Sequence, residues 1–184
     1  MTIFEYLATA ASIVLALSVS RLIAASSHVF SVPGRDWLFA SFFLQIFLTN
    51  LLVWWNLWEL HTIQAWTFPL FLLFIGSPLT LYFTSHLVLD KEPEKVKDWR
   101  VQFEKKRVPM FVTLVLVNVI GTIRHYVSVG EFVAPSVVFF LALGSGALIS
   151  NRNYLWVLTA VLWVTLLYFL SGLFFVPFTV TTSG

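Results

Sequence analysis

Long apolar segments alternate with short polar ones along the whole chain. A helix needs about 20 apolar residues to cross the hydrocarbon core of a bilayer, which is about 30 Å thick. Six segments approach this length, and turn-forming residues separate them, as in the Pro-Gly-Arg-Asp cluster at 33–36. The pattern therefore predicts six transmembrane helices, over residues 3–27, 37–60, 66–88, 108–126, 132–149 and 154–176.

The composition agrees with this pattern, since 59% of the 184 residues are hydrophobic and only 11% are charged. A soluble domain carries about 25% charged residues, so a water-soluble fold of this size would lack polar surface. The first apolar segment has no basic residue ahead of it and contains Glu5, which favours a retained span over a cleaved signal peptide. We predict an all-α fold, a polytopic integral membrane helical bundle that forms a single transmembrane domain over residues 1–184.

The charges are concentrated between the third and fourth predicted helices. The segment 89–107 holds seven of the eleven Lys and Arg residues and five of the nine acids. With six spans, Arg35 and Arg152 fall on the same side as this segment, and only Arg124 lies near the other side. The positive-inside rule then makes 89–107 a cytoplasmic loop and leaves both termini outside the cytoplasm. Trp-rich runs such as 51–60 are similar to those of many bacterial inner-membrane proteins, so we expect that membrane.

The charged loop contains an amphipathic pattern. Val96, Trp99 and Phe103 recur at helical spacing among Lys, Arg, Glu and Asp. This spacing predicts a short cytoplasmic helix in the plane of the headgroups, although a solvated loop held by charge pairs has the same composition. The residues expected to contact lipid headgroups are Trp99, Lys105, Lys106 and Arg107. The lipid bilayer is thus the expected partner of this segment, and we expect no nucleic-acid site.

The second predicted helix carries polar residues along one face. At about 100° per residue, an arc of roughly 80° holds Ser41, Gln45, Thr49, Asn56 and Glu59. Lipid does not form hydrogen bonds, so such a face turns toward protein or toward a water-filled cavity. Hydrogen bonds between helices explain the four neutral residues, whereas Glu59, close to the helix end, is either functional or interfacial.

The fourth predicted helix repeats this pattern with Asn118, Thr122 and His125 on one face. His125 lies at the same depth as Glu59 of the second helix. We predict that these two helices share a polar cavity in which the His and Glu pair relays protons; the alternative is that His125 is an ordinary interfacial residue. The residues assigned to a proton or solute pathway are Glu59, His125, Asn56, Asn118, Gln45, Thr49 and Arg21.

Arg21 lies about two turns from the cytoplasmic end of the first predicted helix. Its long side chain either reaches the headgroups or pairs inside the bundle, where Gln45 and helix carbonyl groups are candidate partners. In the second case Arg21 is also a candidate for holding an anionic substrate.

The first predicted helix has small residues at every fourth position, which allows another helix to approach closely. They are Ala8, Ser12, Ala16, Ser20 and Ala24, and a shorter series follows at Ala142, Gly146 and Ser150. Both series predict packing, either within the bundle or across a homodimer interface. A larger membrane complex is the other partner that we consider.

The sequence lacks the common catalytic and metal-binding motifs. It has no cysteine, no Gly-rich phosphate loop, no HExxH and no GxSxG, so we assign no catalytic residue and no metal site. The four histidines are His28, His61, His86 and His125. Two histidines on neighbouring helices are a known way of ligating haem, so haem is the one candidate cofactor.

Three functions are compatible with these patterns. We predict a channel or transporter for a small solute or ion that moves through the polar cavity. The alternative is a non-catalytic subunit or scaffold of a larger membrane complex, which the packing series and the missing catalytic motifs favour. The second alternative is a membrane redox enzyme that depends on haem or lipid, although the missing motifs favour the absence of enzymatic activity.

Overall fold

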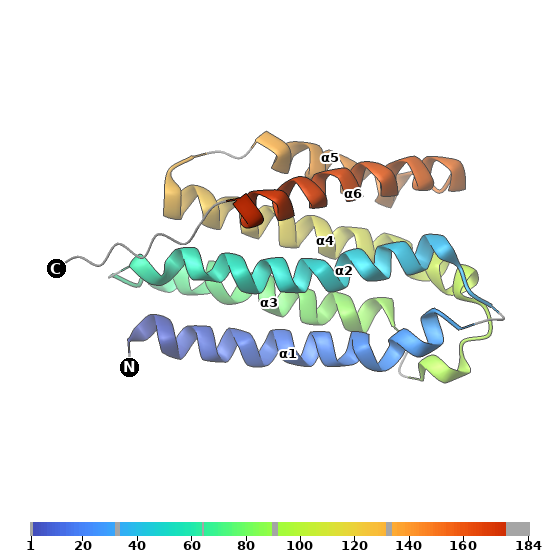
Figure 1. Ribbon diagram of the computed structural model, residues 1–184, viewed down its shortest axis with the longest axis horizontal. Coiled ribbons are helices and arrows are strands. Elements are labelled where there is room, and N and C mark those ends of the chain that lie inside the picture. The colour runs from blue at the N-terminus through green and yellow to red at the C-terminus, as the bar shows by residue number, and fades with distance from the viewer. Residues whose placement is uncertain (1, 32–33, 64, 90–91, 132–133, 176–184) are drawn as a thin grey trace.

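The computed structural model consists of helices that run along one long axis (Figure 1). It describes residues 2–31, 34–63, 65–89, 92–131 and 134–175, without the side chains of Glu59, Thr62, Ala134 and 172–175, and these ranges contain no β-strand. The α-helices are α1 (Ile3–Val29), α2 (Trp37–Asn56), α3 (Phe68–Val88), α4 (Trp99–Val129), α5 (Ala134–Leu148) and α6 (Arg152–Phe175). Two short 3₁₀-helices, η1 (Leu57–Thr62) and η2 (Pro93–Lys95), follow α2 and precede α4.

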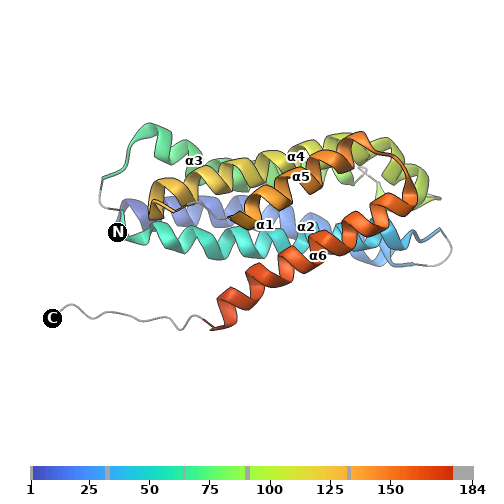
Figure 2. The ribbon, with the colours of Figure 1, turned by 90° about the horizontal axis from the view of Figure 1, so that it is seen from above.

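Successive helices run in alternating directions, so the connections gather at two ends of the bundle (Figure 1 and Figure 2). We call one of them the charged end; it holds the connections from α1 to α2, from α3 to α4 and from α5 to α6. Gly34, Lys97 and Arg152 line one pocket there, which shows that the three connections lie together. The start of α1 and the end of α6 lie at the opposite end. Arg35, Arg152 and Lys97 of the charged segment thus lie at one end of the bundle, and their common side of a membrane remains a prediction.

One face of α1 is buried against the rest of the bundle. Its buried residues recur at three- and four-residue spacing, which places them on one helix face, and they are Phe4, Leu7, Ala11, Leu15, Ser18, Leu22, Ala25 and Val29. The small residues on this buried face, Ala11, Ser18 and Ala25, let α3 approach closely. The Ser18 hydroxyl donates to the Leu81 carbonyl oxygen of α3 at 3.3 Å. α1 therefore packs on α3 as well as on α2.

Within the described residues, five helices are long and apolar enough to cross a membrane, and they correspond to α1, α2, α3, α4 and α6. The remaining apolar helix, Pro135–Leu148 within α5, is shorter. At about 1.5 Å per residue, α5 extends about 22 Å, which is less than the thickness of the hydrocarbon core. The described part of the chain therefore has the helices of a multi-pass membrane protein, five of them long and one shorter, and the shorter one corresponds to the predicted span 132–149.

The charged segment after α3 differs from its prediction. From Trp99 onward it forms the first turns of α4, which continues through Pro109, and the three residues of η2 are the only separate helix in the described part of this segment before them. The Trp99 ring stacks on Phe39 of α2 with the centroids 5.0 Å apart, and Phe103 stacks on Phe42 at 5.6 Å. Trp99 is only 2% exposed. The helical spacing is confirmed for Trp99 and Phe103 but not for Val96, which has extended backbone between η2 and α4. The predicted contact of Trp99 with headgroups is wrong, because α2 covers the apolar face of this segment.

Candidate functional site

α6 packs against the polar face of α2 in the half of α2 nearer the charged end. The Gln45 amide nitrogen Nε2 donates to the Thr159 carbonyl oxygen at 3.3 Å, and Nε1 of Trp163 donates to the Ser41 hydroxyl at 2.7 Å. The Thr49 hydroxyl donates within its own helix, to the Gln45 carbonyl oxygen at 2.7 Å. These side chains thus make hydrogen bonds within and between helices, the use that the sequence offered as the alternative to a cavity.

The helices α2 and α4 meet through aromatic side chains near the charged end. The rings of Phe42 and Phe111 pack edge to face with their centroids 5.1 Å apart. Farther along, α4 packs on α3, where the Ile120 side chain comes within 3.4 Å of where a β-carbon at Gly76 would lie. These contacts are apolar, and the polar cavity predicted between α2 and α4 remains a prediction.

The remaining pathway residues belong to α2, η1 and α4. Asn56, Asn118 and His125 are half-buried. The Asn118 carbonyl oxygen accepts the Thr122 hydroxyl at 2.8 Å. The side chain of Glu59 lies outside the described part of the chain, so its pairing with His125 remains a prediction.

Arg21 pairs inside the bundle, which is one of the two alternatives for this residue. Its Nη2 donates to the carbonyl oxygen of Leu89, the C-cap residue of α3, at 3.3 Å. The last carbonyl groups of a helix lack donors within the helix, and the helix dipole favours a cation beside them. Arg21 therefore ties α1 to the charged end of α3, and this bond does not involve Gln45.

Arg107 is buried in protein instead of reaching the headgroups. It is 8% exposed. Its Nη1 donates to the carbonyl oxygens of Gly146, of Ala147 at 3.2 Å and of Ile149 at 2.9 Å, all at the C-terminal end of α5. Glu104 lies 3.8 Å from its Nε. The predicted headgroup contact of Arg107 is wrong for a physical reason: α5 ends against α4, and its last carbonyl groups need a donor there.

The two series of small residues have different surroundings. A β-carbon at Gly146 would lie 2.6 Å from Phe111 and 2.7 Å from Leu158, so glycine lets α5 approach α4 and α6, and the packing interpretation is confirmed there. In α1 the Ser12 hydroxyl accepts from Nε1 of Trp54 at 3.0 Å, and Ala8 is half-buried. The rest of the α1 series is exposed, namely Ala16, Ser20 and Ala24.

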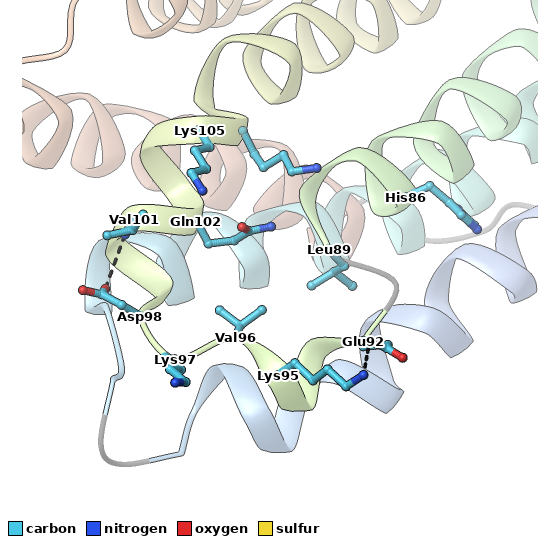
Figure 3. Close-up of a pocket in the computed structure, with 11 residues that line it drawn as sticks. His86, Leu89, Glu92, Lys95, Val96, Lys97, Asp98, Val101, Gln102 and Lys105 are labelled. Carbon is cyan, nitrogen blue, oxygen red and sulfur yellow. Dashed lines mark hydrogen bonds and ion pairs between the residues drawn. The ribbon is translucent and has the colours of Figure 1, made fainter.

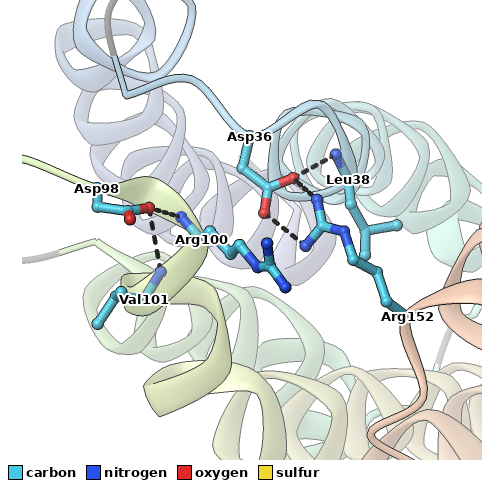
Figure 4. Close-up of polar contacts among 6 residues, drawn as sticks. All are labelled: Asp36, Leu38, Asp98, Arg100, Val101 and Arg152. Carbon is cyan, nitrogen blue, oxygen red and sulfur yellow. Dashed lines mark hydrogen bonds and ion pairs between the residues drawn. The ribbon is translucent and has the colours of Figure 1, made fainter.

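Asp36 and Arg152 form a two-point ion pair between α2 and α6 at the charged end (Figure 4). Nη1 of Arg152 donates to Oδ2 of Asp36 at 3.0 Å, and Nη2 donates to Oδ1 at 2.7 Å. Oδ1 also accepts from the Leu38 backbone nitrogen at 2.9 Å, so the same carboxylate caps α2. The Asp36 side chain is 2% exposed and that of Arg152 is 32% exposed. Sequence reasoning placed Arg152 on the same side as Arg35, the neighbour of Asp36, but did not pair Arg152 with Asp36.

Two open pockets lie at the charged end. The first has a volume of about 760 Å³ and lies between the end of α3, η2 and the start of α4 (Figure 3). Four lysines line it, namely Lys95, Lys97, Lys105 and Lys106. The second, of about 430 Å³, shares Lys97 with the first and is also lined by Arg35, Arg100 and Arg152. Lys105 and Lys106 thus lie at a cation-rich surface, where their contact with headgroups remains a prediction.

The histidines lie near helix ends, as expected. Nδ1 of His61 lies 2.7 Å from the Trp58 carbonyl oxygen, and Nδ1 of His86 lies 3.0 Å from that of Tyr82. Within the described ranges, no group of three or more His, Cys, Asp or Glu side chains could hold a metal ion. Haem ligation by two histidines remains a prediction that an absorbance spectrum of the purified protein would test.

No protein-family model, curated protein or solved structure matches the chain. Its function therefore has to be inferred from its own residues. Two features matter most for this purpose: the polar side chains that bond between helices inside the bundle, and the cation-rich pockets at the charged end.

Proposed function

We propose that the chain is a non-catalytic subunit or scaffold of a membrane assembly. The observation that carries this proposal is the use of polar side chains as bonds between helices. Gln45 and Ser41 bond to α6, while Arg21 and Arg107 bond to the ends of α3 and α5. Such bonds hold helices in fixed positions, whereas a solute path needs polar groups that exchange partners with the solute. The exposed small residues of α1 offer a surface that another helix can approach.

Purification from the native membrane tests this proposal. We expect the tagged full-length protein, extracted in a mild detergent, to retain either a distinct membrane protein or a second copy in a fixed ratio. Because the chain has no cysteine, Ser20→Cys introduces a single reactive thiol on the exposed face of α1. We expect this variant to cross-link to the retained subunit in the membrane.

Val164→Cys is the control, because Val164 is an exposed residue of a different helix, α6. We expect it to give no cross-linked product. A protein that is monomeric and without a partner in mild detergent, and that does not cross-link at Ser20, would contradict the assembly.

Transport of a small solute or ion is the second candidate, and one observation favours it. Oδ1 of Asn50 in α2 and the hydroxyl of Ser77 in α3 are buried, and no described residue gives them a hydrogen-bond partner. Buried polar atoms of this kind are sites where water or an ion binds. Proton or ion flux into proteoliposomes that disappears with Asn50→Leu, or with Glu59→Gln in the predicted pathway, would favour transport over assembly.

We further propose that all six helices cross the membrane, with α5 as a short span and the charged end in the cytoplasm. Arg35, Lys97 and Arg152 line one pocket, so these cations lie at the same end of the bundle. The positive-inside rule favours the cytoplasm for an end rich in Lys and Arg. A helix shorter than the hydrocarbon core is accommodated by local thinning of the bilayer or by neighbouring helices.

Single cysteines test this topology, since the chain has no thiol of its own. The three positions are exposed: Glu131 between α4 and α5, Ser150 after α5, and Lys97 before α4. An impermeant maleimide is expected to label Glu131→Cys on intact cells, and to label Lys97→Cys and Ser150→Cys only after permeabilisation. Labelling of Ser150→Cys together with Glu131→Cys would show that α5 does not cross.

A further inference from the structure

We propose that the pocket lined by Lys105 and Gln102 at the charged end binds the phosphate group of an anionic lipid. Its volume of about 760 Å³ lies in the range of about 300–1,000 Å³ that is usual for small-ligand sites. This inference does not depend on the proposed assembly, because it concerns a different surface of the bundle.

The charge of the pocket favours an anion. Lysines predominate in its lining, and they are Lys95, Lys97, Lys105 and Lys106. The acids of the lining, Glu92 and Asp98, already have partners. Glu92 lies 2.6 Å from the ammonium nitrogen of Lys95, and Oδ1 of Asp98 accepts from the backbone nitrogens of Arg100 and Val101 at 2.8 and 3.3 Å. The lining therefore retains more positive than negative charge for a bound ligand.

A buried donor lies among these lysines. Gln102 is only 7% exposed, and its Nε2 has no hydrogen-bond partner among the residues that the structure describes. Figure 3 shows its carboxamide extending from α4 into the space between Lys105, Val96 and Leu89. A buried donor without an acceptor is destabilising, and a phosphate oxygen would supply a charged acceptor at this position.

The surface of α4 beside the pocket indicates a lipid as the source of the phosphate. Lys105 lines the pocket, and Val108, Val112 and Leu116 follow it within an arc of roughly 80° on the same face of α4. All three are exposed large hydrophobic residues. A lipid with its phosphate beside Lys105 can lay an acyl chain along these side chains, whereas a soluble phosphate gains nothing from them.

Binding of three phosphate-containing probes to the full-length protein in a neutral detergent tests the inference. The probes are phosphatidylglycerol, phosphatidylcholine and inorganic phosphate, with affinities measured by native mass spectrometry and from the rise in unfolding temperature. We expect phosphatidylglycerol to bind at least about tenfold more tightly than either of the others. Gln102→Leu is expected to weaken phosphatidylglycerol binding about tenfold without changing the charge of the pocket.

The lysines are tested with a variant pair matched in charge. Lys105→Ala with Lys106→Ala is expected to weaken phosphatidylglycerol binding by about tenfold or more. Arg35→Ala with Arg100→Ala removes two cations from the same end of the bundle but outside this pocket, and is expected to change the affinity less than about threefold. An equal loss in the two pairs would overturn the site in favour of general surface charge.

The other outcomes are also decisive. Equal affinity for phosphatidylcholine would overturn the preference for an anionic lipid. Inorganic phosphate that binds as tightly as phosphatidylglycerol, with the same dependence on Gln102, would overturn the lipid as the source while supporting the phosphate site. Without lipid, Gln102→Leu is expected to unfold at the same or a higher temperature, since it removes an unpaired buried donor, and this separates lost binding from misfolding.

Discussion

Replacing Arg107 with Met is expected to lower the free energy of unfolding by about 3 kcal/mol. Met keeps an apolar stem of similar length but removes the donor to the carbonyl oxygens of Gly146, Ala147 and Ile149. These groups end α5 against α4, and Gly146 is buried there, so little water can replace the donor that its carbonyl oxygen loses. Unfolding of the detergent-solubilised protein by a denaturant, at a fixed ratio of lipid to detergent, measures the loss.

The charged segment of α4 supplies its own control. Arg100→Met makes the same chemical change at an exposed position two turns earlier in α4 and is expected to leave unfolding unchanged. Arg107→Lys should fall between the two, because an ammonium group is a compact charge and lacks the planar fork of a guanidinium. Equal free energies of unfolding for Arg107→Met and Arg100→Met would show that the hydrogen bonds from Arg107 to the end of α5 do not contribute to stability.

The helices were predictable wherever one apolar run is interrupted by strong turn residues. The predicted span 3–27 corresponds to α1 at Ile3–Val29, and the predicted span 66–88 corresponds to α3 at Phe68–Val88. The end of the second helix could not be predicted from apolar runs and turn residues, since the predicted span reaches residue 60 and α2 ends at Asn56. Residues 57–60 continue the apolar pattern of α2, but the structure places them in the 3₁₀-helix η1, and hydropathy does not distinguish these two helix types.

The largest error came from treating charge as a boundary. Trp99, Phe103, Arg107 and Phe111 are four residues apart and all are buried in α4. The predicted boundary between the charged loop and the fourth span falls inside this series. Extending the helical spacing across that boundary would have placed Arg107 on the buried face of the helix. α4 continues through Pro109 although a proline inside a helix removes one backbone hydrogen bond and crowds the preceding turn, and the packing of this face on α2 offsets that cost.

The partners of the polar residues could not have been predicted from the sequence. Gln45 bonds to a carbonyl oxygen 114 residues away, and a backbone acceptor leaves no signal in the residue type that carries it. The polar face of α2 was visible, since periodicity determines which side chains share a face. Whether that face meets a helix or water depends on how the helices pack, which is a tertiary property. Because α6 covers this polar face, we favour an assembly role over transport.

Removal of the Asp36 carboxylate is expected to lower the free energy of unfolding by about 3 kcal/mol when the residue becomes Ala. Two interactions are lost together, the cap on α2 and the ion pair with Arg152. Asp36→Asn separates them, because Asn remains a good N-cap but carries no charge, and it should recover about 1 kcal/mol. Chemical unfolding of both variants in the same detergent provides the comparison.

A double-mutant cycle isolates the ion pair itself. Arg152→Met alone should cost less than Asp36→Ala, because Arg152 is 32% exposed and its charge is partly solvated, whereas the Asp36 side chain is 2% exposed. The coupling energy between the two residues is expected to be about 1–2 kcal/mol. The exposed pair of Glu92 and Lys95 is the control, and removing either member should not change stability measurably. A coupling near zero would mean that α2 and α6 are held at the charged end by apolar packing, and that the buried carboxylate acts only as a helix cap.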